Sequence, residues 1–149
     1  MRRAACILAV VLGLTSPAGT QESVRDTSHN LSVSGPGSVR AVSETRVCVF
    51  CHTPHGANTE VSAPLWNRAL SGATYTPYTS SSIDAQDIAA TPGGSSKLCL
   101  SCHDGTLAIG TVNVLGGQQN VTIPMTGTAP DGSMPPGNMN RWMNSGLRR

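Results

Sequence analysis

Two short segments of this 149-residue chain hold four of its five cysteines and two of its four histidines. The first reads Cys48-Val-Phe-Cys51-His52 and the second Cys99-Leu-Ser-Cys102-His103, so the pattern CxxCH occurs twice. Two thiols at this spacing can bond the two vinyl groups on one edge of a porphyrin, and the adjacent histidine is then held over the iron. The repeated pattern predicts two covalently bound haem c groups. The thioether donors would be Cys48, Cys51, Cys99 and Cys102, and the proximal iron ligands His52 and His103.

Two other uses of paired cysteines are weaker alternatives. A zinc ribbon usually places about 15–20 residues between its CxxC pairs, whereas 47 residues separate Cys51 from Cys99. Local disulfides would suit an exported protein. Neither a zinc-binding CxxC protein nor a disulfide protein explains why a histidine follows each pair, so haem is favoured.

The two remaining histidines, His29 and His55, are the candidate distal ligands. His52 and His55 are three residues apart, so their Cα atoms lie at most about 10 Å from each other. Trans ligands need some 12 Å between their Cα atoms, since each side takes about 2 Å of metal–nitrogen bond and roughly 4 Å of side chain. We therefore expect His55 on the second iron, opposite His103, and by elimination His29 on the first, opposite His52. The short turn from His52 to His55 would then bring the two haems close together.

Methionine is the rival sixth ligand, and a His/Met pair would raise the haem potential relative to His/His. The candidates follow the second motif and are Met125, Met134, Met139 and Met143.

The N-terminus predicts export. Arg2 and Arg3 precede an apolar run from Ala4 to Leu14 and a zone of small residues, which is typical of a signal peptide over residues 1–18. The run is too short to span a bilayer, and no second apolar stretch follows it, so no membrane span is expected after cleavage. The predicted location is periplasmic or extracellular, where c-type haem is attached.

Composition predicts a loop-rich fold. The chain has one Phe, two Trp and two Tyr against 16 Gly and 10 Pro, which leaves few of the large side chains that fill a core. We expect a mostly irregular dihaem domain over residues 19–137, with a few short helices and a core formed by the haems. Thr111–Leu115 and Val121–Met125 could pair as one small hairpin around Gly116-Gly117, and residues 84–90 could form one or two helical turns.

Charge suggests no polyanionic partner. The ten Lys and Arg residues include Arg2 and Arg3, which leave with the signal peptide, so the mature chain balances its eight Asp and Glu residues. It has no basic stripe, and nucleic-acid binding is not expected.

Several stretches together resemble the exported multihaem c-type cytochromes with doubled CxxCH motifs, relatives of the secreted cytochromes of metal-reducing bacteria. The resemblance extends over roughly residues 28–137. The stretches that carry it are His29-Asn-Leu-Ser32, Val47 to Ala57, Ala63-Pro-Leu-Trp-Asn-Arg68, Tyr75, Tyr78 and Ser96 to Thr106. The resemblance implies a loop-rich multihaem cytochrome c fold with closely spaced, mostly bis-histidine haems, and it supports His29 and His55 as distal ligands. The segment 138–149 diverges from that family and reads as a truncated end.

The expected role is electron transfer rather than enzymatic catalysis, with redox proteins or other multihaem cytochromes as partners and with a homo-oligomer or filament as a further form. The alternative is a haem enzyme or sensor in which one iron is open or Met-ligated, since catalysis at haem needs an open position.

Overall fold

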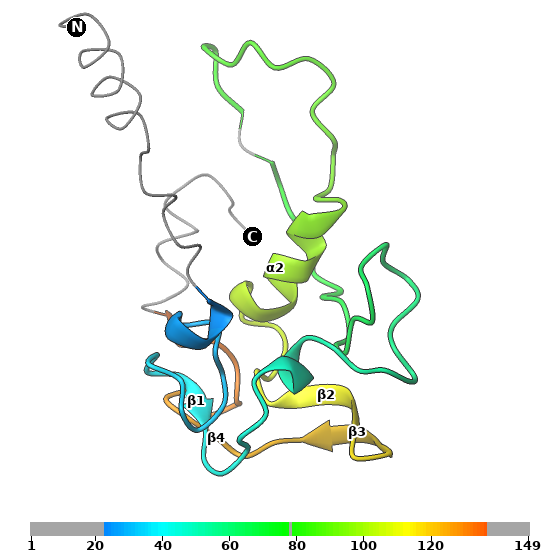
Figure 1. Ribbon diagram of the computed structural model, residues 1–149. Coiled ribbons are helices and arrows are strands. Elements are labelled where there is room, and N and C mark those ends of the chain that lie inside the picture. Colours follow the sequence, from blue (N-terminus) through cyan, green and yellow to red (C-terminus); the bar gives the residue numbers. More distant parts are fainter. Residues whose placement is uncertain (1–22, 78, 137–149) are drawn as a thin grey trace, which may run out of the picture.

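The computed structural model describes residues 23–77 and 79–136, and the predicted signal peptide and divergent tail lie outside them. Short elements are joined by long irregular segments (Figure 1). The helical elements are the 3₁₀ helices η1 and η2 and the α-helix α2, which span Val24–Asp26, Cys48–Phe50 and Ser95–His103. The strands β1 to β4 span Arg40–Ala41, Thr111–Leu115, Gln118–Thr122 and Met125–Thr126. No helix among these residues is long and apolar enough to cross a membrane.

The strands β2 and β3 form a hairpin at the position that the sequence predicts. Thr111 pairs with Thr122 and Leu115 with Gln118. Gly116 and Gly117 connect them with φ of 58° and 84°, the two positive values that a tight two-residue hairpin turn requires. The second strand starts earlier than expected, because this turn fixes the register directly after Gly117.

The chain leaves this hairpin at Pro124 and enters a second small sheet. Here β4 pairs antiparallel with β1, so that Ala41 faces Met125 and Arg40 faces Thr126. The sheet joins the two ends of the described chain and brings the segment before the first cysteine motif against the segment after the second.

The apolar core is small and consists of two clusters. One contains Ala41, Phe50, Val112 and Ile123, and Cys51 packs against it. The other contains Val39, Ile109 and Met134, and Cys102 packs against it. Leu31 and Met125 contact both clusters and join them. The inner cysteine of each CxxCH motif is thus anchored at the edge of a core cluster.

A long loop separates the two motifs. Residues 69–94 contain neither helix nor strand where the structure describes them, and residues 81–91 are exposed. The helical turns expected over residues 84–90 are absent, so that prediction is wrong. The reason is that an isolated helix this short is unstable without a buried apolar face, and Ile83 and Ile88 remain exposed. The loop projects away from the N-terminal end of α2 (Figure 1).

Candidate functional site

The first motif forms one tight helical turn. The backbone amides of Cys51 and His52 both donate to the Cys48 carbonyl, at 3.1 Å and 2.8 Å. Phe50 points into the core and is fully buried, whereas Cys48 is exposed and Cys51 is half-buried. This turn lies against β2 (Figure 1). Both thiols are free, and so are those of the second motif.

The side chain of His52 is oriented by a backbone carbonyl. Its Nδ1 lies 2.9 Å from the carbonyl oxygen of Pro64, which can only accept, so Nδ1 carries the proton. The exposed imidazole keeps Nε2 for another ligand. A hydrogen bond of this kind orients metal-binding histidines in proteins. The backbone supports the position, because Thr53 donates to the Leu65 carbonyl at 2.9 Å.

The second motif lies on α2. Cys99, Cys102 and His103 occupy the last turns of this helix, which ends at His103. Ser101 between the cysteines is fully buried and donates to the Leu98 carbonyl at 2.7 Å. Burial lowers the pKa of His103, and the charge of the nearby His29 lowers it further. Both effects favour the neutral imidazole, which is the form that binds metals.

His29 lies against His103, with ring centroids 6.3 Å apart and ring planes at 74°. The turn that carries His29 is held by Asn30, which is almost fully buried. The Asn30 side chain donates to the Arg25 carbonyl at 2.8 Å and accepts from the Ser32 amide at 3.1 Å. His29 is therefore presented to the C-terminal end of α2.

This arrangement differs from the pairing expected from elimination. From the sequence, His29 is expected opposite His52 and His55 opposite His103, whereas the structure brings His29 against His103. The distance argument that separates His52 from His55 still holds, but it does not decide which iron His29 reaches. That choice depends on how the chain before the first motif folds back over α2, which no local spacing encodes.

His55 and the methionines occupy different environments. His55 is exposed, and its carbonyl accepts a hydrogen bond from Thr53 Oγ1 at 2.8 Å. Met134 is buried in a core cluster and Met125 packs against both clusters. Met139 and Met143 lie outside the described residues. Neither described methionine is presented to solvent as a spare ligand.

Asp104, directly after the second motif, collects hydrogen bonds from the loop. It accepts from Ser71 Oγ, from the Tyr75 hydroxyl at 2.5 Å and from the Thr106 amide at 2.9 Å. Burial raises the pKa of Asp104, but these hydrogen bonds outweigh burial and lower the pKa below its ordinary value. The carboxylate fixes the start of the long loop to the end of α2.

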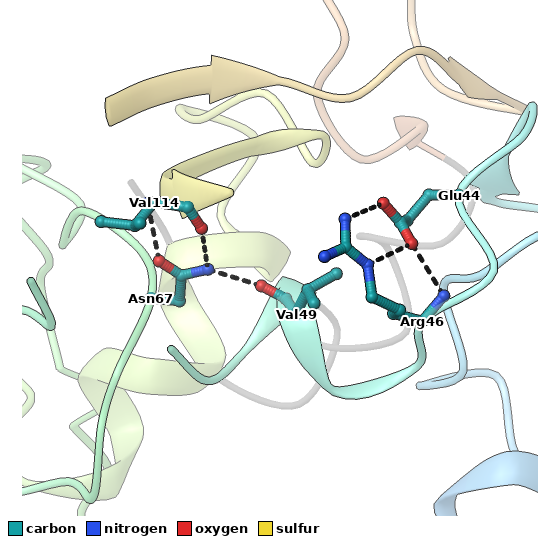
Figure 2. Close-up of polar contacts among 5 residues, drawn as sticks. All are labelled: Glu44, Arg46, Val49, Asn67 and Val114. Carbon is teal, nitrogen blue, oxygen red and sulfur yellow. Dashed lines mark hydrogen bonds and ion pairs between the residues drawn. The ribbon is translucent and has the colours of Figure 1, made fainter. Parts of the chain in front are cut away.

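The segment Trp66-Asn67-Arg68 holds the two motifs together, a role that sequence reasoning did not predict. Asn67 is fully buried. Its side-chain Nδ2 donates to the carbonyls of Val49 and Val114 at 2.6 Å and 2.9 Å, and its Oδ1 accepts from the Val114 amide at 2.9 Å (Figure 2). Arg68 is also buried and donates to three carbonyls around the second motif. Two polar residues among apolar neighbours are the signal that could have revealed this role.

An exposed ion pair precedes the first motif. Arg46 donates to Glu44 through its backbone amide at 2.8 Å and through its guanidinium at 2.9 Å and 2.8 Å (Figure 2). The hydrogen bond from the Arg46 side chain lowers the pKa of Glu44 to about 2. The pair closes the turn that leads into Cys48.

The cysteines and histidines of the two motifs do not gather into one metal-ligand cluster in the described part of the chain. A structural zinc ion takes four side-chain ligands, but within the described part of the chain no three His, Cys, Asp or Glu side chains converge. Haem iron takes one or two side-chain ligands, which an oriented His52 and a facing pair of histidines can supply. No family model matches the chain, and no curated protein matches it.

Proposed function

We propose that this protein is an exported dihaem c-type cytochrome that transfers electrons. The two CxxCH motifs carry this proposal, because each offers two free thiols and an adjacent histidine. The thiols would hold the cofactor covalently, and His52 and His103 would be the proximal ligands. When bound, haem supplies reversible one-electron chemistry.

The facing rings of His29 and His103 are the single structural observation that best supports haem ligation. Two imidazoles bonded trans to one metal have ring centroids about 6 Å apart, since each metal–nitrogen bond is about 2 Å and each centroid lies about 1 Å beyond the nitrogen. The separation of 6.3 Å fits this value. His29 would therefore hold the second haem together with His103.

A second candidate function follows from the same pairing. His29 is assigned to the second haem, and His55 is too close along the chain to His52 to share its iron. None of the four histidines in this sequence therefore remains as a distal ligand for the first haem. That haem would be five-coordinate or Met-ligated. An open position is what a haem enzyme or gas sensor needs, so this alternative applies to the first haem alone.

The proposed partners are redox proteins or other multihaem cytochromes that the protein would encounter in the periplasm or outside the cell. Clustered haems in a thin polypeptide wrapping would also suit a homo-oligomer or filament. Neither basic patches nor nucleic-acid motifs mark the sequence.

The test is the visible spectrum of the protein after export into a periplasm that attaches c-type haem. We expect two haems for each chain by pyridine haemochrome and by intact mass. The four-cysteine variant, with Ser at positions 48, 51, 99 and 102, should carry none. Absence of a Soret band together with bound zinc would instead identify a zinc-binding CxxC protein.

A further inference from the structure

Arg68 is a buried cation without a carboxylate partner among the described residues. Its side chain is 1% exposed. The guanidinium donates from Nη1 to the Ile109 carbonyl at 2.6 Å, and from Nη2 to the carbonyls of Ala108 and Ser101 at 3.0 Å and 3.5 Å. Its Nε is enclosed and forms no hydrogen bond within the described part of the chain. A guanidinium stays protonated at all ordinary pH values, so a full positive charge is held inside the protein.

Burying such a charge is unfavourable unless it is well compensated. Carbonyl oxygens compensate it only in part, because each carries a partial charge. A neutral amide such as glutamine could donate to two of these carbonyls without burying a charge. The hydrogen bonds alone therefore do not account for a charged side chain here.

The position of Arg68 relates it to both motifs. The backbone amide of the neighbouring Asn67 donates to the carbonyl of Cys51 at 2.9 Å. The guanidinium of Arg68 reaches the carbonyl of Ser101, which precedes Cys102. The two inner cysteines pack against core clusters that share Leu31 and Met125. The fixed charge thus lies between the two segments that would attach the haems.

We propose that Arg68 is a buried fixed charge that raises the reduction potentials of both haems. This inference rests on the proposed dihaem function. Oxidation of a haem adds one positive charge to the site. A buried cation nearby disfavours that state, and water screens it poorly. The guanidinium would therefore act on both haems in the same direction.

The experiment is potentiometry of purified holoprotein with Arg68→Met. We expect both midpoint potentials to shift to more negative values, by amounts that change little between low and high ionic strength. Arg46→Met is the matched control, because it removes the same charge at an exposed position two residues before Cys48. Its shift should be smaller and should vanish at high salt. Equal shifts in the two variants, or no shift in Arg68→Met, would overturn the proposal.

Arg68→Lys separates charge from shape. This variant keeps the positive charge, so both potentials should stay near those of the parent protein. A shift as large as that of Arg68→Met would overturn the electrostatic role.

If Arg68→Met does not accumulate with haem, Arg68→Gln replaces it as the neutral variant. Loss of holoprotein in the Lys variant as well as in both neutral variants would also overturn the proposal, since shape rather than charge would then be required. Failure of the proposed function is distinct, because the parent protein itself would then carry no haem.

Discussion

The side chain of Asn67 makes with Val114 the two hydrogen bonds that a neighbouring β-strand would make. Its Nδ2 donates to the Val114 carbonyl at 2.9 Å, and its Oδ1 accepts from the Val114 amide at 2.9 Å. The same Nδ2 also donates to Val49 inside the first CxxCH motif at 2.6 Å. One amide thus connects the first motif to the exposed edge of β2, across 47 residues of chain (Figure 2).

Asn67→Asp should destabilise the folded protein strongly. A carboxylate cannot donate to the two carbonyls, and it would place a buried negative charge against them. Each unsatisfied buried group costs about 1–3 kcal/mol, so we expect a loss of about 3 kcal/mol in the free energy of unfolding, measured by urea denaturation of the holoprotein. Asn120→Asp is the control, since Asn120 is exposed in β3. Similar midpoints for the two variants would show that the network contributes little.

The pairing of His29 with His103 predicts which histidine variant opens the second haem. In the parent protein we expect carbon monoxide to bind at most at the first haem. His29→Ala should remove the distal ligand of the second haem, giving a high-spin band and carbon monoxide binding there. His55→Ala should leave that haem low-spin. Difference spectra of the reduced variants decide the matter, and the opposite pattern would restore the pairing expected from elimination.

The sequence alone predicts the parts of the site that depend on local spacing. The CxxCH motifs give the thiols and proximal histidines as candidates, and Gly116-Gly117 gives the hairpin, because turn geometry is encoded by the two residues that adopt it. The partner of His29 and the roles of Asn67 and Arg68 depend on contacts between distant segments. Irregular loops have no periodicity from which such contacts can be inferred, and the polar residues in question are embedded in an apolar stretch. The haem ligation itself stays a prediction.

The hydrogen bonds that Asp104 accepts from Ser71 and Tyr75 should hold the start of the long loop, residues 69–94, against the end of α2. Tyr75→Phe removes the hydroxyl that lies 2.5 Å from the carboxylate and should cost about 1.5–3 kcal/mol, as expected for a hydrogen bond to a charged group. Hydrogen exchange at residues 71–75 should become faster, while exchange in β2 and β3 should not change. Ser82→Ala, in the exposed part of the same loop, should leave both regions unchanged. An unaltered exchange rate in Tyr75→Phe would mean that other contacts hold the loop.

The Glu44–Arg46 pair predicts a small loss of stability in acid. The pKa of Glu44, about 2, lies below the ordinary value of 4.5. The pair therefore stabilises the fold fully above about pH 4.5 and loses this contribution as the pH falls toward 2. Because the pair is at the surface, we expect about 0.5 kcal/mol. Unfolding of the parent and of Glu44→Gln should differ by this amount at pH 6 and converge at pH 2, and high salt should reduce the difference at pH 6. A difference that persists at pH 2 would assign the effect to something other than the carboxylate charge.

Gly127 predicts how strongly the fold depends on the sheet that joins β1 and β4. Its φ is +75°, and a Cβ there would lie 2.0 Å from the Ser38 carbonyl oxygen. The close contact can be relieved only by moving Ser38, which leads into β1. Gly127→Ala should therefore disrupt the pairing of Arg40 with Thr126. We expect a cost of at least about 2 kcal/mol, since an unfavourable backbone region alone costs about 1–3 kcal/mol.

Gly93→Ala is the control, because a Cβ there meets nothing within 4 Å and the backbone is unstrained. It should leave the protein as stable as the parent or slightly more stable, because alanine restricts the unfolded chain. If chemical denaturation gave both variants the same midpoint, the close approach of Gly127 to Ser38 would not be a constraint on the fold.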